Sequence, residues 1–338
     1  MAYWYRCCLI GLIAATLADA DKARGDDPES IRIASWNVEW FFDHYAGDNR
    51  SDLAKEKTAP SRASWQWKLS TTAKIIAELE PTIIALQEIE NQQVLFNLVR
   101  ELEEQHGLKY RYAYIPGYDF FTEQDVAFLY QHGLVEYSRR EQSPEMFESR
   151  EYYNLNKHLF ARFEFGTGDN KESVTLVNVH LRSGAEQEDI RKRQMRLLKA
   201  WIDPLLVRGE NVILLGDLNT EQFVGQYGAD SDMGIATGMH TPQTEDDMID
   251  LHQFLPEPLR NTHITEKQLD RLIVSPALTK DIPGRRDLVF SRIITRRDLV
   301  IGDDMDPVED HFNRYWELPD ATRDVSDHYP IMAEFIFK

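Results

Sequence analysis

Six segments of the sequence place a carboxylate, amide or imidazole side chain at or near the end of a predicted β-strand. A single polar residue after a strand is usually a turn or helix-cap residue, but six ends of matching chemistry are hard to explain as caps. Because strand ends are rigid and let a side chain escape the core, catalytic residues gather there. We therefore expect one active site built from Asn37, Glu88, His180, Asp217 with Asn219, Asp270, and the pair Asp327-His328.

These residue types suit the hydrolysis of a phosphate ester. The reaction needs a polarised phosphoryl oxygen, an aligned water and a stabilised leaving oxygen. Mg²⁺ prefers oxygen ligands and is commonly held by one or two carboxylates together with phosphate and waters. The set contains no thiolate and no three-histidine group, so we expect Mg²⁺ as the cofactor, with Mn²⁺ or Ca²⁺ as alternatives.

Over residues 31–338 the sequence resembles the endonuclease/exonuclease/phosphatase superfamily, whose best-known secreted branch is the pancreatic-type deoxyribonucleases. The resemblance implies an α/β fold, a four-layer α/β/β/α sandwich with two mixed β-sheets. It rests on six motifs in the family's order, which are Ser35-Trp36-Asn37, Gln87-Glu88, Asn178-Val179-His180, Gly216-Asp217-Leu218-Asn219, Leu269-Asp270-Arg271 and Ser326-Asp327-His328.

The resemblance also implies which residues hold the metal and the water. Glu88 is then the principal metal carboxylate, with Asn37 and Asp327 beside it. Asp217 would orient and deprotonate the attacking water, and Asn219 would hold that water or the phosphate.

By the same resemblance, His180 and His328 flank the phosphate as proton donors or charge stabilisers. A histidine oriented by a carboxylate has a fixed tautomer and a raised pKa, so it stays charged near neutral pH. We expect Asp270 to be the partner of His328, and we place Asp125 beside His180. Arg182 directly follows the His180 motif and is a candidate for substrate binding, although an ordinary surface arginine is an equal alternative.

Two acidic residues are harder to place. Relatives often carry an acidic residue at the position of Glu39, but a solvated strand-end glutamate fits as well. DNA-cutting relatives carry an arginine two residues after the metal glutamate, where this chain has Glu90. A carboxylate cannot donate to a phosphate or a base edge. We therefore predict weak DNA binding, and that Glu90→Arg would strengthen it.

Other charged groups receive structural interpretations. Alternating charges make the basic stretch at 285–297 a charged surface ribbon rather than a phosphate-binding patch. The acidic cluster at 303–306 lacks the spacing and glycine of an EF-hand. We expect Arg191 to be solvated or paired on its helix. The remaining histidines, His263 and His311 among them, show no metal-ligand spacing, and we assign them no role.

The elements that must position the site alternate along the chain. No internal repeat or linker divides it, so we expect one domain over 31–338. Runs that are apolar on both faces, such as 83–86 and 213–215, indicate sheets covered on both sides. We predict helices at 67–80, 92–105 and 186–206, and strands at 31–38, 83–87, 111–115, 126–130, 159–165, 174–181, 212–216, 269–274 and 331–337.

Composition limits the functional classes. The chain has 38 basic and 57 acidic residues and a net charge of −19, so any polyanion must be met by metal ions or a local basic patch. No apolar run is long enough for a multi-span membrane protein. Residues 1–20 have the layout of a signal peptide, followed by a short polar leader at 21–30. Both cysteines, Cys7 and Cys8, lie in that signal peptide, so we expect an exported, secreted or periplasmic protein without disulfides.

These observations favour a secreted, divalent-metal-dependent phosphodiesterase, a nuclease acting on DNA as a monomer without stable membrane association. The alternatives are a sphingomyelinase-like phospholipase, a phosphoinositide phosphatase, and a non-catalytic binding protein. The first lacks an evident exposed aromatic hairpin, because Phe41-Phe42 adjoins a strand end and Trp65 opens a helix. The second lacks the basic and aromatic motifs of that branch. The third is least favoured, since every expected catalytic position is retained.

Overall fold

The computed structural model describes residues 28–168, 171–284, 286–302 and 305–338. The predicted signal peptide, and the leader as far as residue 27, lie outside the described residues. The described chain forms two mixed six-stranded sheets. The first has the strand order β11 (Leu288–Thr295), β12 (Ile331–Phe337), β1 (Ser30–Phe41), β2 (Ile83–Ile89), β4 (Asp125–Tyr130) and β3 (Arg111–Tyr114). The second has the order β5 (Leu134–Ser138), β6 (His158–Phe165), β7 (Glu172–His180), β8 (Asn211–Asp217), β10 (Asp270–Val274) and β9 (Ile249–Asp250).

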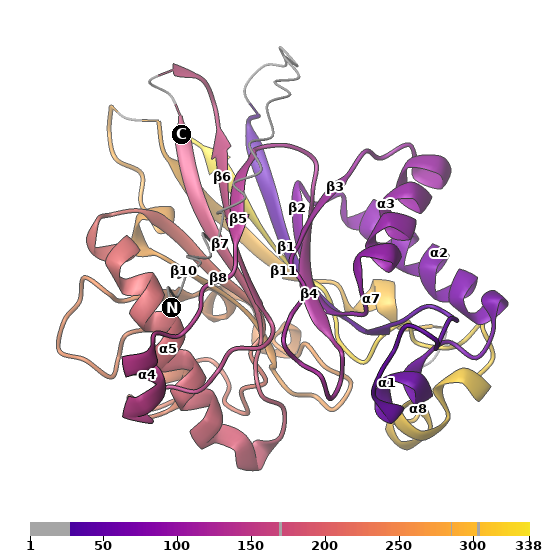
Figure 1. Cartoon of the computed structure of the whole chain (residues 1–338). Helices are drawn as coiled ribbons and strands as arrows, with labels where there is room; N and C mark the ends of the chain where they lie inside the picture. The colour runs from indigo at the N-terminus through magenta and orange to yellow at the C-terminus, as the bar shows by residue number, and fades with distance from the viewer. Residues whose placement is uncertain (1–27, 169–170, 285, 303–304) are drawn as a thin grey trace, which may run out of the picture.

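The two sheets pack face to face, and helices cover their outer faces (Figure 1). Apolar side chains of both sheets, such as Phe128 and Phe163, form the central core. A second core lies between the first sheet and its helices, and a third lies between the second sheet and the long helix α5. The helices are α1 (Asp52–Lys57), α2 (Arg62–Leu79), α3 (Gln92–His106), α4 (Pro144–Ser149), α5 (Glu188–Val207), α6 (Asp232–Ala236), α7 (Arg297–Val300) and α8 (Val308–Arg314).

This architecture confirms the predicted four-layer α/β/β/α sandwich. All nine predicted strands and all three predicted helices are present, most of them with shifted boundaries. Helix α2 begins five residues early, at Arg62, because the hydroxyl of Ser61 caps it by accepting from the Ser64 amide. Strands β5, β9 and β11 were not predicted. β5 is largely exposed, β9 has two residues, and polar residues interrupt the apolar pattern of β11. Among the described residues, no helix is both long and apolar enough to cross a membrane.

The central strands are irregular where they end. The register shifts between Asn37 and Phe41 on β1, and at Glu88 on β2. Glu39, Trp40 and Glu88 have positive φ angles of 47°, 41° and 62°, and Asn219 after β8 has 51°. Such backbone is unfavourable for residues other than glycine and persists where the surrounding structure requires it, frequently at functional sites. The bulges set the direction of Glu88 against its neighbours in the strand.

Candidate active site

A polar cavity of about 330 Å³ lies at the ends of the central strands of both sheets. The structure brings most of the residues expected from the sequence to this cavity. Asn37 and Asp270 do not line it, because both are fully buried behind the lining residues. The predicted residues that line it are Glu88, His180, Arg182, Asp217, Asn219, Asp327 and His328.

A buried amide pair joins the two sheets behind the cavity. The side chain of Gln87 donates to Asn178 at 2.8 Å, and that of Asn178 donates to the carbonyl oxygens of Leu86 and Ala127. Glu88 directly follows Gln87, and His180 lies two residues after Asn178. The first residue of each of these two motifs therefore ties the sheets together and positions the polar residue that follows.

The Ser35-Trp36-Asn37 and Ser326-Asp327-His328 motifs are also tied to each other. The Ser326 hydroxyl donates to the Asn37 carbonyl at 2.8 Å and accepts from the His328 amide. The Trp36 indole donates to the His328 carbonyl at 3.0 Å. These contacts fix the loop before β12 against the end of β1.

Gly216 allows β8 to approach β7 closely. Its φ is 131°, and a Cβ atom there would lie 2.0 Å from the carbonyl oxygen of Val179. The parallel register pairs His180 with Asp217, and the antiparallel register of β10 pairs Asp270 with Asp217. Hence the glycine of the Gly-Asp-x-Asn motif is what lets His180 Nε2 lie 3.5 Å from an Asp217 oxygen.

The oxygen donors at the cavity fit a hard divalent cation. Burial, and then the charge of Asp327, raise the pKa of Glu88 to about 7. Burial alone would raise the pKa of Asp327, but His328 and His263 lower it well below its ordinary value. Two crowded carboxylates, one of which is costly to ionise, are a donor set that a cation would stabilise. Glu88 and Asp327 would hold such an ion.

Asn37 lies between the carboxylates. Its amide nitrogen donates to Glu88 at 3.1 Å and to Asp217 at 3.0 Å, while its oxygen accepts from the Glu39 amide. In this arrangement Asn37 positions Glu88 and Asp217 and presents no oxygen to the cavity. Its role as a metal ligand stays a prediction.

His328 is held in its charged form. Its Nδ1 lies 2.7 Å from an Asp270 oxygen, which is the partner expected from the sequence. Burial alone would lower the pKa of His328, but Asp270, Asp327 and Asp217 outweigh it and raise that pKa well above its ordinary value. Asp270 is therefore a positioning residue, and His328 presents a fixed positive Nε2–H to the cavity.

The expected partnership between His180 and Asp125 is wrong. The Asp125 carboxylate instead accepts hydrogen bonds from the Tyr114 hydroxyl and the Gly117 amide. Among the described residues none forms a hydrogen bond with His180 Nδ1. Burial, then the charges of Lys157 and His328, lower the pKa of His180 well below its ordinary value. His180 is thus a neutral imidazole, not the charged one expected.

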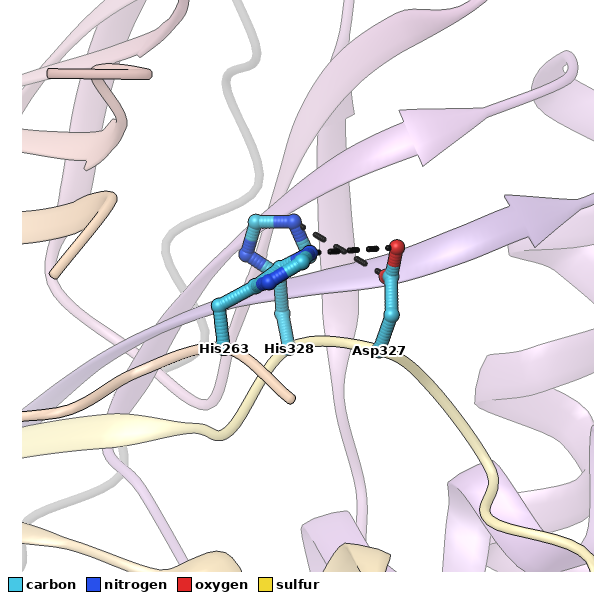
Figure 2. A group of neighbouring side chains, drawn as sticks. All are labelled: His263, Asp327 and His328. Carbon is cyan, nitrogen blue, oxygen red and sulfur yellow. Dashed lines mark ion pairs between the residues drawn. The ribbon is translucent and has the colours of Figure 1, made fainter. Parts of the chain in front are cut away.

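Two lining residues were missed. His263 Nε2 lies 3.4 Å from Asp327, and its ring packs edge-on against His328 at 4.6 Å (Figure 2). An isolated β-bridge between His263 and His328 creates this contact. Lys157 also lines the cavity and pairs with Asp119 at 3.3 Å. Neither has a spacing that sequence reasoning could use, because loops bring both to the site.

Glu39 is a structural support. It accepts from the Asp327 amide at 3.1 Å and pairs with His311 at 2.8 Å. His311 also contacts Asp306 at 2.9 Å. Burial alone would lower the pKa of His311, but Glu39 leads the contacts that raise it to about 9. His311, to which we assigned no role, is thus a charged link behind the loop that carries Asp327.

Glu90 does not face the solvent as a free carboxylate. It is 6% exposed and accepts from the Asp43 amide and the Asn49 side chain, both at 2.8 Å. Burial raises its pKa to about 7. Glu90 therefore holds the loop after β1, and an arginine there would have to break these contacts; the predicted gain in DNA binding stays a prediction.

The remaining charged groups agree only in part with the interpretations drawn from the sequence. Arg191 is buried, not solvated, and pairs with Asp232 at 2.7 Å. In the basic stretch, Arg292 pairs with Glu334 and Arg296 with Asp298, both at 2.7 Å, as expected for a charged ribbon. Two residues of the acidic cluster, 303 and 304, lie outside the described residues.

Comparison with known proteins agrees with this geometry. The model of the endonuclease/exonuclease/phosphatase family matches residues 34–328. The chain belongs to this family. Members of the family are metal-dependent phosphoric ester hydrolases. No curated protein sequence matches the chain.

Solved structures of the family share the fold at low sequence identity. The D. rerio TDP2 complexed with single strand DNA product is 16% identical, with a TM-score of 0.54, over 91% of this chain and 99% of that one. The human Nocturnin catalytic domain with bound sulfate anion is 15% identical, with a TM-score of 0.55, over 92% and 96%. A family protein from Bacteroides vulgatus is 15% identical, with a TM-score of 0.56, over 91% and 99%. These likenesses show a common fold.

Proposed function

We propose that the protein is an exported, divalent-metal-dependent phosphodiesterase that hydrolyses nucleic acid, with DNA as its main substrate. The observation that supports this best is the joint placement of Glu88, Asp217 and His328 at one cavity, with His328 held positive by Asp270. A fixed cation beside two carboxylates suits a phosphate with a water to be activated. The DNA product in a family structure supports the choice of substrate.

The chain's own residues supply the hydrolysis steps. Burial raises the pKa of Asp217, which makes it a stronger base for the attacking water. Asp217 takes a proton from the water, the water oxygen forms a new bond to phosphorus, the ester P–O bond breaks, and the leaving oxygen takes a proton from solvent. His328 donates to the phosphate, and neutral His180 can donate one hydrogen bond through Nε2. A divalent ion bound by Glu88 and Asp327 would neutralise charge on the phosphoryl oxygens.

The experiment is a substrate panel with the purified mature protein. Linearised plasmid DNA, RNA, bis-nitrophenyl phosphate and sphingomyelin are each incubated with Mg²⁺, Mn²⁺ or Ca²⁺. We expect hydrolysis of DNA and bis-nitrophenyl phosphate, and loss of both in Asp217→Asn. If none of the substrates were hydrolysed with any ion, the protein would not be a phosphodiesterase.

One observation favours a second candidate, a phospholipid phosphodiesterase. Tyr118, Phe120 and Phe121, on the loop before β4, are 53%, 67% and 70% exposed, and Phe121 lines the cavity. The sequence did not reveal these exposed aromatic residues beside the site. Sphingomyelin hydrolysis exceeding that of DNA would support this candidate.

Export stays a proposal that rests on residues 1–20 alone. Sequencing the N-terminus of the protein recovered from outside the cytoplasm tests it. A start near Asp21 would support removal of a signal peptide, and recovery of the intact chain inside the cell would contradict it.

A further inference from the structure

A groove of about 760 Å³ adjoins the catalytic cavity, and Asp119 lines both. Its volume lies within the range of roughly 300–1,000 Å³ typical of small-molecule sites. The groove runs between the start of helix α3 and the loop that carries Phe120. No step of the hydrolysis uses it, so it is available to the part of the substrate that flanks the scissile phosphate.

The groove has fewer cations to offset its carboxylates than the cavity, where Glu88, Asp119, Asp217 and Asp327 lie beside Lys157, Arg182 and the charged His328. Asp48, Glu90, Asp119, Glu123 and Asp125 line the groove. Among its lining residues, all in the described part of the chain, only Arg50 is a cation. The cations Lys157 and Arg182 line the cavity and not the groove. Burial raises the pKa of Glu90 and of Asp125, and Asp119 pairs with Lys157, so Asp48 and Glu123 are the carboxylates that would repel a second phosphate in the groove.

The remaining lining is aromatic and amide. Phe96 is 46% exposed and Phe120 is 67% exposed, and both line the groove together with Tyr112 and Tyr114. Such rings offer stacking surfaces to planar heterocycles. Side-chain amides also line it, among them the exposed Gln92. Amides can pair with the polar edge of a base. This lining suits an uncharged, planar, hydrogen-bonding group.

We propose that the groove binds the terminal nucleoside of a nucleic-acid strand, so that the enzyme cleaves the last phosphodiester and acts from a strand end. In this arrangement the strand continues on the side of the cavity away from the groove. This inference rests on the proposed phosphodiesterase activity and specifies its substrate.

The first test uses three p-nitrophenyl phosphodiesters and the wild-type protein. They are thymidine 5′-(p-nitrophenyl phosphate), the same compound with an added 3′-phosphate, and methyl p-nitrophenyl phosphate. We expect kcat/KM for the nucleoside ester to exceed that of the methyl ester by about five- to 150-fold, the range expected for stacking of one base. The 3′-phosphate should cancel most of this gain, and added salt should restore part of it.

Variants assign these effects to the groove. Phe120→Ala should lower the ratio of kcat/KM for the nucleoside ester to that for the methyl ester, whereas Phe147→Ala, which removes a 66% exposed ring on α4, should not. Asp48→Asn should reduce the penalty of the 3′-phosphate, because Asp48 is exposed in the groove. Asp230→Asn, at another exposed site, is the matched control.

Linear and circular single-stranded DNA of one sequence give the second test. Loss of nucleotides from linear ends, with circles left intact, supports the proposal. Cleavage of circles, or a nucleoside ester no better than the methyl ester, would overturn it while leaving the phosphodiesterase activity standing. If none of the three esters and neither DNA were hydrolysed, the proposed function itself would be refuted.

Discussion

Glu90 gives a stability test whose sign depends on pH. Burial raises the pKa of this carboxyl from 4.5 to about 7, so the folded state binds the proton more tightly than the unfolded chain does. The resulting stability is fully present below about pH 4.5 and is lost as the pH rises through 7. A rise from 4.5 to about 7 corresponds to about 3 kcal/mol of unfolding free energy.

Glu90→Gln cannot ionise and should not lose this stability. It replaces one acceptor oxygen by a donor, however, so Asp43 or Asn49 loses a partner at a cost of about 1–3 kcal/mol. The variant should therefore be less stable than the wild type near pH 4.5, and equal to it or more stable near pH 8. Urea unfolding across this range, followed by tryptophan fluorescence, gives both free energies.

The surface variant Glu148→Gln, on exposed α4, is the control and should follow the wild type at every pH. Parallel curves for Glu90→Gln and the wild type would refute the claim that Glu90 is buried with a raised pKa. Glu90→Arg should be destabilised by about 3–5 kcal/mol throughout, because it buries an unpaired cation. A stable Glu90→Arg with raised DNA affinity would contradict the structure in the same way.

Four further outcomes are expected. EDTA should abolish phosphodiesterase activity without unfolding the protein, and full turnover in excess chelator would contradict the assignment of Glu88 and Asp327. Asp217→Asn and His328→Ala should each lower kcat by at least roughly a hundredfold in steady-state kinetics. The double variant should lower kcat by much less than the product of the two single effects. Burial lowers the pKa of His158 from 6.5 to about 4. The free energy of unfolding should therefore fall by up to about 3 kcal/mol as the pH falls from about 6.5 to 4. His158→Gln should not show this fall when both proteins are unfolded in urea. Because the chain has a net charge of −19, the slope of log K for DNA against log salt should be only about −2 to −4, measured by titration at several salt concentrations, and a steeper slope would refute it.

The residues of the site could be identified from the sequence because they lie in short motifs at strand ends. Glu88 and Asp217 lie in the last two residues of β2 and β8, His328 lies three residues before β12, and the family resemblance supplied their roles. The partnership of His328 with Asp270 was also predicted, because both residues belong to such motifs. Local pattern was sufficient there.

Protonation and burial required the tertiary structure. His180 and His328 look alike in the sequence, yet His328 is charged beside Asp270 while His180 is neutral and has no partner for Nδ1 among the described residues. Asp125, the partner expected for His180, is bound instead by Tyr114 and Gly117. Which side chains form hydrogen bonds in a site depends on the direction in which they leave neighbouring strands. The apolar periodicity of the sequence does not give that direction.

Sequence by itself determined the strands and helices, because apolar periodicity fixes which segments become which, and the family resemblance implied the sandwich and the roles of the motif residues. Only the tertiary structure showed that His263 and Lys157 line the cavity, since loops carry both there. Only it showed that Glu90 is buried and that an acidic, aromatic groove lies beside the phosphate site. These features depend on contacts between segments far apart in the chain, and their energies come from burial and from the charges that surround each group.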